Sequence, residues 1–203
     1  MEKIKFTRDQ LKQKVQLLEQ YKRYLPILQL KKQQLQLEIA KYQKLMEEKT
    51  QIFEKKQKFC SDWIGLAKVD KIELRKWIKP TKINLTSKNI AGVELPVFLN
   101  LEFNPIDYDI FIYPLWADKA IDYLRELITI EEELKTIKKA IEILKDQLRI
   151  TLQRVNLFEK IKIPQAEEAI HRIKIYLGDQ FTNEVCRSKI AKKKLERIYF
   201  LQD

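Results

Sequence analysis

Residues that form turns, metal sites and general bases are scarce in this chain, whose 203 residues include 3 Gly, 6 Pro, 2 Cys and 1 His. So few Gly and Pro argue against a loop-rich globular fold. The sequence holds no glycine-rich phosphate loop, no nucleophile elbow and no His/Cys cluster with zinc spacing. We therefore expect a non-catalytic protein without cofactor or metal, and we interpret the single histidine, His171, as a solvated or partner-facing residue on a helix.

Long apolar runs are also absent. No stretch of about 18 uncharged apolar residues occurs, and Met1 to Thr7 lacks the apolar core of a secretory signal. We expect neither membrane insertion nor export by that route. Cys60 and Cys186 are isolated in the sequence, so we interpret them as reduced, small apolar residues on the helices of an intracellular protein.

A strict alternation of three- and four-residue steps between apolar positions runs through the second half of the chain. Its members are Leu127, Ile130, Leu134, Ile137, Ile141, Leu144, Leu148, Thr151, Val155 and Phe158, of which only Thr151 is not a large apolar residue. A repeat of 3.5 residues places one narrow apolar seam on a helix, and that seam needs a partner helix wound around it with a left-handed twist.

The first half of the chain offers the partner. A similar spacing links Leu11, Val15, Leu18, Leu25, Leu28, Leu35, Ile39, Tyr42, Met46, Phe53, Cys60 and Trp63. The predicted fold is mainly α: a long antiparallel two-helix coiled coil with a small β-hairpin insert at the end distal to the termini. We expect an N-terminal helix in residues 1–80, the insert in 81–114 and a C-terminal helix in 115–203, all in one elongated unit that brings both chain ends to one tip.

Capping residues and prolines set the predicted helix boundaries. Thr7 offers an N-cap hydroxyl, and the first helix should run to about Ile78 because Pro80 disfavours helix just before it. Pro26 falls where the seam loses phase, and we favour a kink there over a break between two helices. The second helix should begin between Pro114 and Trp116 and be interrupted at Pro164.

The segment between the helices changes period. Alternating apolar residues predict a hairpin that pairs residues 82–87 with 93–99, with Lys88, Asn89 and Gly92 supplying turn or bulge chemistry. Six aromatic residues follow within 19 positions: Phe98, Phe103, Tyr108, Phe111, Tyr113 and Trp116. Some should pack onto the coil, and the others are candidates for a protein-binding patch.

The net charge of +11 is unevenly distributed. Residues 1–80 carry 20 Lys+Arg against 10 Asp+Glu, residues 81–116 carry 2 against 4, and residues 117–203 carry 18 against 15. Three explanations of the basic excess compete: a surface that faces an acidic protein partner, contact with nucleic acid, or the solvated face of a long helix. The acidic run at residues 131–133 is interpreted as a solvated face.

Several stretches resemble the D subunit of the vacuolar and archaeal type of rotary ATPase. The stretch with most weight is Gln153, Arg154, Val155 and Asn156, followed by Glu159, Ile163, Pro164, Ile170, Ile173 and Tyr176 or Leu177. Further similarities are Thr7, Leu11, Leu18, Ile27, Leu28, Lys31, Lys32 and Leu35 near the N-terminus, and Gly92, Val93 and Pro96 in the insert.

The resemblance implies a central rotor shaft without an active site. Its terminal helices would rise into a head of alternating A and B subunits, while the insert end would face the membrane ring. Rotation would couple ATP turnover to the movement of protons or sodium ions. The implied partners are the A, B and F subunits and the subunit that caps the ring, and the implied place is peripheral, on the cytoplasmic side of the membrane.

Candidate partner-binding residues follow from both lines of reasoning. They are Phe98, Phe103, Tyr108, Phe111 and Tyr113 in the insert and Lys192, Lys193 and Lys194 near the C-terminus. The alternatives are a basic arm that binds nucleic acid, or a scaffold on an anionic membrane. Against the first, the aromatic residues cluster in the acidic insert, away from the basic helix; against the second, the helix seam is already committed to its partner.

Overall fold

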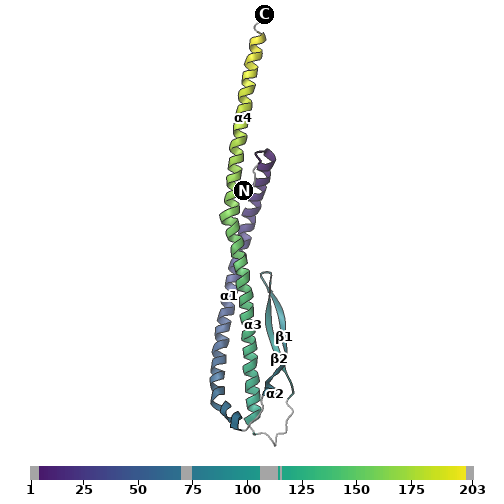
Figure 1. The fold of residues 1–203 in the computed structure, drawn as a ribbon, viewed down its shortest axis with the longest axis vertical. Helices are drawn as coiled ribbons and strands as arrows, with labels where there is room; N and C mark the ends of the chain where they lie inside the picture. The colour runs from purple at the N-terminus through teal and green to yellow at the C-terminus, as the bar shows by residue number, and fades with distance from the viewer. Residues whose placement is uncertain (1–4, 70–74, 106–113, 115, 200–203) are drawn as a thin grey trace. The chain divides into compact units, whose positions relative to one another are not determined.

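The computed structural model describes residues 5–69, 75–105, 114 and 116–199, with side chains described for 5–61, 77–105, 114 and 116–195. Its elements in chain order are α1 (Arg8–Val69), α2 (Arg75–Ile78), β1 (Pro80–Ile90), β2 (Val93–Phe103), α3 (Trp116–Leu157), the π-helix η1 (Phe158–Lys162) and α4 (Ile163–Tyr199) (Figure 1). The mainly helical fold with an antiparallel hairpin, predicted from the sequence, is confirmed.

Thr7 caps α1 as predicted. Its Oγ1 accepts a hydrogen bond from the backbone N–H of Gln10 at 3.3 Å, and its carbonyl oxygen accepts one from Leu11 at 3.0 Å. The first contact satisfies one of the donors that the first helical turn leaves without an intrahelical partner, and the second is the first hydrogen bond of the helix itself. Pro26 lies inside α1, so a break between two helices at that proline is excluded.

The other boundaries agree with the sequence in part. The sequence predicted one helix running to Ile78. The structure describes α1, which ends at Val69, and the single helical turn α2, and residues 70–74 between them lie outside the described part of the chain. Pro80 is the first residue of β1, in keeping with its predicted role as a helix stop. The second helix begins at Trp116, within the predicted window.

The predicted interruption at Pro164 takes the form of a π-helical turn. In η1 the N–H of Ile163 bonds to the carbonyl oxygen of Phe158, five residues earlier. Pro164 has no N–H to donate and its ring crowds the carbonyl four residues before it, so widening the preceding turn relieves a clash that would otherwise break the helix.

Two compact units divide the chain. Residues 1–30 and 151–203 form unit 1, and residues 31–150 form unit 2. Both α1 and α3 run from one unit into the other. The expectation of a single elongated unit stays a prediction.

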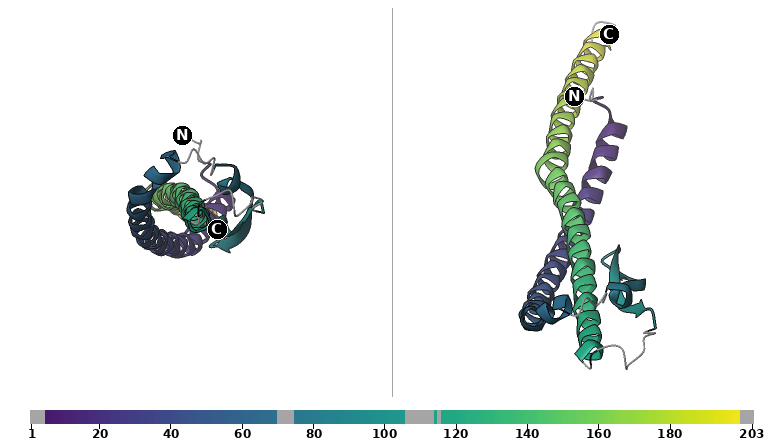
Figure 2. Two further views of the ribbon diagram at one scale, coloured as in Figure 1. Left: turned by 90° about the horizontal axis from the view of Figure 1, so that it is seen from below. Right: turned by 60° about the horizontal axis from the view of Figure 1, so that its bottom comes forward.

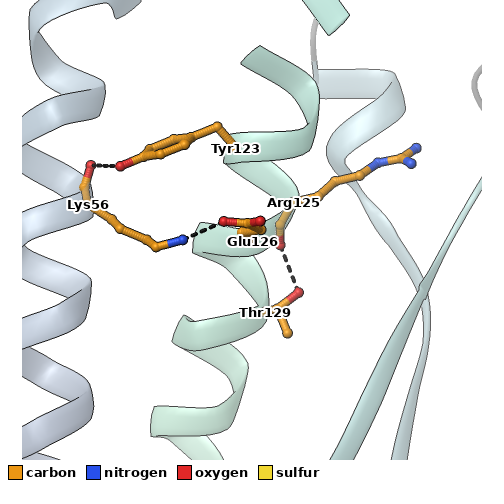
Figure 3. Close-up of polar contacts among 5 residues, drawn as sticks. All are labelled: Lys56, Tyr123, Arg125, Glu126 and Thr129. Carbon is orange, nitrogen blue, oxygen red and sulfur yellow. Dashed lines mark hydrogen bonds and ion pairs between the residues drawn. The ribbon is translucent and has the colours of Figure 1, made fainter. Parts of the chain in front are cut away.

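In unit 2, α1 and α3 form an antiparallel pair whose contacts include charged side chains. Lys49 Nζ lies 2.8 Å from Glu133 Oε2, and Lys56 pairs with Glu126 one heptad further along (Figure 3). The Tyr123 hydroxyl donates to the carbonyl oxygen of Lys56 at 3.2 Å. Glu133 is therefore not part of a solvated face, and that interpretation was wrong because the sequence did not indicate which glutamate meets the other helix.

The hairpin packs onto this helix pair, alongside α3 (Figures 1 and 2). The core joins two residues from each of α1, β2 and α3: Leu35, Ile39, Val93, Leu95, Ala140 and Leu144. Leu35, Leu95 and Leu144 are fully buried. Of the predicted seam of α3 in this unit, Leu134, Ile137, Ile141 and Leu144 are buried and Leu127, Ile130 and Leu148 are half-buried.

Pairing in the hairpin extends further than predicted. Residues 88–90, assigned to the turn, pair with residues 93–95, and β1 and β2 continue to Pro80 and Phe103. The turn contains only Ala91 and Gly92, both with positive φ, of 52° and 74°. The backbone twist of such a two-residue turn matches the twist of paired strands, so the pairing of β1 with β2 continues up to the residues that flank the turn. Asn89 contributes as expected, because its Oδ1 accepts the Gly92 N–H at 3.0 Å.

Arg125 holds the base of the insert against α3. Its Nε and Nη2 donate to the carbonyl oxygen of Trp77 at 3.1 and 2.9 Å, and Nη2 also donates to that of Asn104 at 2.7 Å. The guanidinium lies 5.0 Å from the ring centroid of Phe103. One side chain thus binds the chain just before β1 and just after β2, and Figure 3 shows it pointing away from Lys56.

In unit 1, the beginning of α1 runs antiparallel to η1 and α4. The rings of Tyr21 and Phe158 lie 5.3 Å apart, and those of Phe6 and Tyr176 lie 5.0 Å apart. Val155, Ala166, Ile170 and Ile173 are buried in this pair, and Thr151 and Phe158 complete the seam as buried and half-buried residues.

The expectation that the chain ends meet at one tip is wrong. Phe6 lies beside Tyr176, yet α4 continues to Tyr199, past the first turn of α1 (Figure 1). At a rise of 1.5 Å per residue, the overhang measures roughly 35 Å.

We expect the substitution Leu144→Ala to lower the free energy of unfolding by about 2–5 kcal/mol, because it removes a fully buried side chain from the junction of both helices and the hairpin. Leu99→Ala, at a residue that is 61% exposed, is the matched control and should change it by about 0.5 kcal/mol or less. Urea unfolding followed by circular dichroism measures both. Equal effects would show that this junction is not the core of unit 2.

We expect Arg125→Met to loosen the insert without unfolding the helices, because three hydrogen bonds to backbone carbonyls are lost. Hydrogen exchange measured by mass spectrometry should accelerate about tenfold in the ends of β1 and β2 near Arg125 and stay unchanged around Leu144. The control is Arg149→Met, since Arg149 is an exposed residue of the same helix that pairs with Asp146 one turn away. Unchanged exchange in the strands would contradict this role.

Candidate partner-binding surfaces

Reactive side chains do not converge in the part of the chain that the structure describes. Across those residues, no group of three or more His, Cys, Asp or Glu side chains could hold a metal ion. His171 is exposed on α4, and burial raises the pKa of the Cys60 thiol, which lowers its reactivity. None of the described helices is long and apolar enough to cross a membrane.

The aromatic candidates of the insert divide into two groups. Phe98 and Phe103 are half-buried, and Phe103 lies under the guanidinium of Arg125, so its ring contributes to the fold of the insert. Tyr108, Phe111 and Tyr113 lie outside the described residues. The proposed aromatic patch thus stays a prediction, and Phe103 is only partly available to it.

The second half of α4 forms a surface that we call the α4 overhang, residues 177–195. Apart from the half-buried Leu177, its apolar side chains are exposed, with Phe181 at 62%, Ile190 at 56% and Leu195 at 57%. Lys192, Lys193 and Lys194 are also exposed, at the far end of the same segment.

The register of the two helices could have revealed this overhang. With Phe6 beside Tyr176 and the helices of unit 1 antiparallel, later residues of α4 extend past the start of α1. A heptad pattern records a seam but not the length of the helix that covers it. The missing information was therefore the register of the two helices.

A second surface was missed from the sequence altogether. Leu45, Ile52 and Phe59 recur every seven residues on α1, and they are 38%, 44% and 59% exposed. The ring of Phe59 lies 5.3 Å from that of Tyr123 on α3, so these residues border the seam. Their spacing could have identified them, but the seam residues of α1 were easier to recognise because they match the seam of α3.

Comparison with known proteins places the chain among the subunits of ATP synthases. The family model described as the D subunit of ATP synthase matches residues 10–193. The D subunit of the V-type ATP synthase of Borreliella burgdorferi is 46% identical over 195 residues, which cover 96% of each chain. The protein of the same name from Chlamydia pneumoniae is 31% identical, covering 95% of this chain and 93% of its own. The chain belongs to the family of ATP synthase D subunits.

Proposed function

We propose that the chain is the non-catalytic central shaft of a V/A-type ATPase or ATP synthase. In this role it transmits torque between ATP turnover in a head of A and B subunits and proton or sodium transport through a membrane ring. The F subunit and the ring-capping subunit are its further partners, and its position is peripheral, on the cytoplasmic side of the membrane.

The α4 overhang is the observation that carries this proposal. A helix that extends past its partner with exposed Phe181, Ile190 and Leu195 leaves apolar surface that water solvates poorly. A surrounding collar of subunits would cover that surface from all sides. Single apolar contacts of this kind are weak and directionless, so the helix could exchange one set for the next as it turns.

Transmission of torque requires that the two helices do not slide past each other. The pairs Lys49–Glu133 and Lys56–Glu126 connect α1 to α3 at two levels one heptad apart. The buried junction around Leu144 adds a third connection that includes the hairpin. A twist applied to one helix of unit 2 would therefore be shared by the other helix and the insert.

The three lysines of the overhang offer a complementary electrostatic contact. Lys192, Lys193 and Lys194 are exposed, and successive residues of a helix point about 100° apart, so their charges spread around the rod. Acidic loops of a collar could meet positive charge at several rotational positions, which suits a bearing better than one strong ion pair.

The main test is assembly and turnover. We expect one copy of the chain, co-expressed with A, B and F subunits, to co-elute in size-exclusion chromatography, and deletion of residues 190–203 to change the ATPase rate of the assembled head. Phe181→Ser should act in the same direction, whereas Ile175→Ser, on another face of α4 and 53% exposed, is its matched control. A chain that ignores these subunits but binds RNA or DNA in a salt-dependent way would favour the nucleic-acid arm.

We expect replacement of Lys192, Lys193 and Lys194 by Gln to weaken coupled activity and to reduce its dependence on salt, because three exposed charges are removed without loss of apolar surface. ATP-driven ion uptake by the reconstituted enzyme, measured at low and physiological salt, gives both quantities. Replacement of exposed Lys174, which lies on α4 before the overhang, is the control. Unchanged coupling in the triple variant would remove the electrostatic part of the proposal.

A further inference from the structure

The seam of unit 1 contains one irregular step. Along α3, η1 and α4 the seam runs through the buried or half-buried residues Val155, Phe158, Ile163, Ala166, Ile170 and Ile173. Every step is of three or four residues except the one from Phe158 to Ile163, which is of five. The same two residues are joined by the π-helical hydrogen bond, from the N–H of Ile163 to the carbonyl oxygen of Phe158. Because a heptad seam advances only by threes and fours, η1 accommodates one surplus residue in its wider turn.

The helix opposite η1 has no surplus residue. The half-buried residues of α1 in this unit advance by three, four and three positions: Leu18, Tyr21, Leu25 and Leu28. The loss of phase expected at Pro26 is therefore not found, because Tyr21 lies in the seam and Lys22 is exposed. The surplus residue is confined to one of the two helices.

A missing backbone donor weakens α1 at the same level. Pro26 has no N–H, so the carbonyl oxygen of Lys22 cannot accept the regular helical hydrogen bond from it. The Lys22 side chain pairs with Glu167 at 2.8 Å, and the ring of Tyr21 lies 5.3 Å from that of Phe158. These contacts place the weakened turn of α1 beside η1. Both helices thus lose regular backbone hydrogen bonds at one level of unit 1.

Buried side chains are also scarce at this level. None of the residues of η1 is buried, and its Ile161 is exposed, as is Leu157 just before it. On α1, Tyr24 and Ile27 are exposed as well. The resistance of a segment to local opening comes from buried apolar contacts and protected backbone hydrogen bonds, and this level has few of either.

We propose that unit 1 has a hinge at this level, formed by η1 and residues 22–26 of α1, at which the two helices bend while the seam on either side stays paired. Kinks in helices occur at prolines and at π-helical turns, and here one of each lies side by side. Pro164 limits the wide turn on its C-terminal side, because it has no N–H for the next π-helical hydrogen bond.

The hinge does not rest on the proposed function, because the experiments below use the chain alone. In a shaft, the hinge would let the part of unit 1 beyond it, including the α4 overhang, change direction without loss of helical pairing.

Distances between two spin labels test the hinge in the full-length chain. Labels at Gln153→Cys and Lys174→Cys lie before and after η1, and both positions are exposed. The native thiols are removed by Cys60→Ala and Cys186→Ser. Double electron–electron resonance gives the distribution of distances between the labels, and bending at η1 broadens it.

A matched pair of labels supplies the control. Asp118→Cys and Lys139→Cys are exposed positions on a regular stretch of α3, the same number of residues apart as the first pair. We expect the distribution across η1 to be about twofold broader than that of the control pair, because the control stretch contains no proline and no π-helical turn.

Two variants repair the two halves of the hinge. Pro26→Ala restores the missing N–H in α1. Deletion of Lys160 together with Pro164→Ala removes the surplus residue and the proline, so that a regular α-helix keeps the same seam. Each variant should narrow the distribution across η1, and hydrogen exchange in the repaired stretch should slow about tenfold. Circular dichroism verifies that the helices persist.

Deletion of Glu168 is the control for the shortened helix. It removes one residue from a regular part of α4, where no wide turn can absorb the change, so Ile170 and Ile173 would leave the seam. This deletion should lower the melting temperature by about 5 °C or more, whereas the Lys160 deletion with Pro164→Ala should not lower it.

Three results would overturn the proposal. Equal widths for the two label pairs in the chain with native helices would show that no hinge lies at η1. A broad distribution that neither variant narrows would show that the bending arises elsewhere. If the Lys160 deletion lowers the melting temperature as much as the Glu168 deletion, η1 holds no surplus residue. Pro26→Ala leaves the length of every helix unchanged, so it tests the hinge independently of the deletions.

Discussion

The antiparallel register of α1 and α3 is the constraint on which the rest of unit 2 depends. Apolar seams alone define it poorly, because a slip of seven residues again places one apolar stripe on another. The lysines in the seam are less tolerant. A slip in one direction would keep one ion pair, Lys49 with Glu126, but bring Lys56 near Lys119. A slip in the other would keep Lys56 with Glu133 but bring Lys49 near Ala140, which is fully buried. Partly exposed ion pairs add little stability by themselves. A slipped register, however, would place one lysine beside a like charge or in the buried core, and that cost favours the observed register.

Once the register is fixed, one short stretch of α3 positions the insert. Glu126 faces α1 and the neighbouring Arg125 faces the two ends of the hairpin, since adjacent helical residues point about 100° apart (Figure 3). The far end of the hairpin is held independently by Val93 and Leu95 against both helices. A two-stranded hairpin alone has marginal stability. Because this one is anchored at its base and near its turn, it becomes part of the packed unit.

Local chemistry explains how much of this fold the sequence could predict. Thr7, Pro80 and the helix start at Trp116 act through their own backbone and near neighbours, so their effects are visible in sequence. The length of the hairpin was underestimated because a two-residue turn at Ala91 and Gly92, with Ala91 at positive φ, is not what turn propensities favour. The partner of each lysine depends on residues more than 60 positions away, and no local pattern records that.

The candidate surfaces follow the same division. Lys192, Lys193 and Lys194 were identified because a run of charge is evident in any sequence, whereas the exposure of Phe181, Ile190 and Leu195 depends on where α1 begins beside α4, and no local pattern records that. In the proposed shaft, the seam with α3 would keep α1 in register, and the part of α4 that α1 does not cover would supply the surface that turns within the collar.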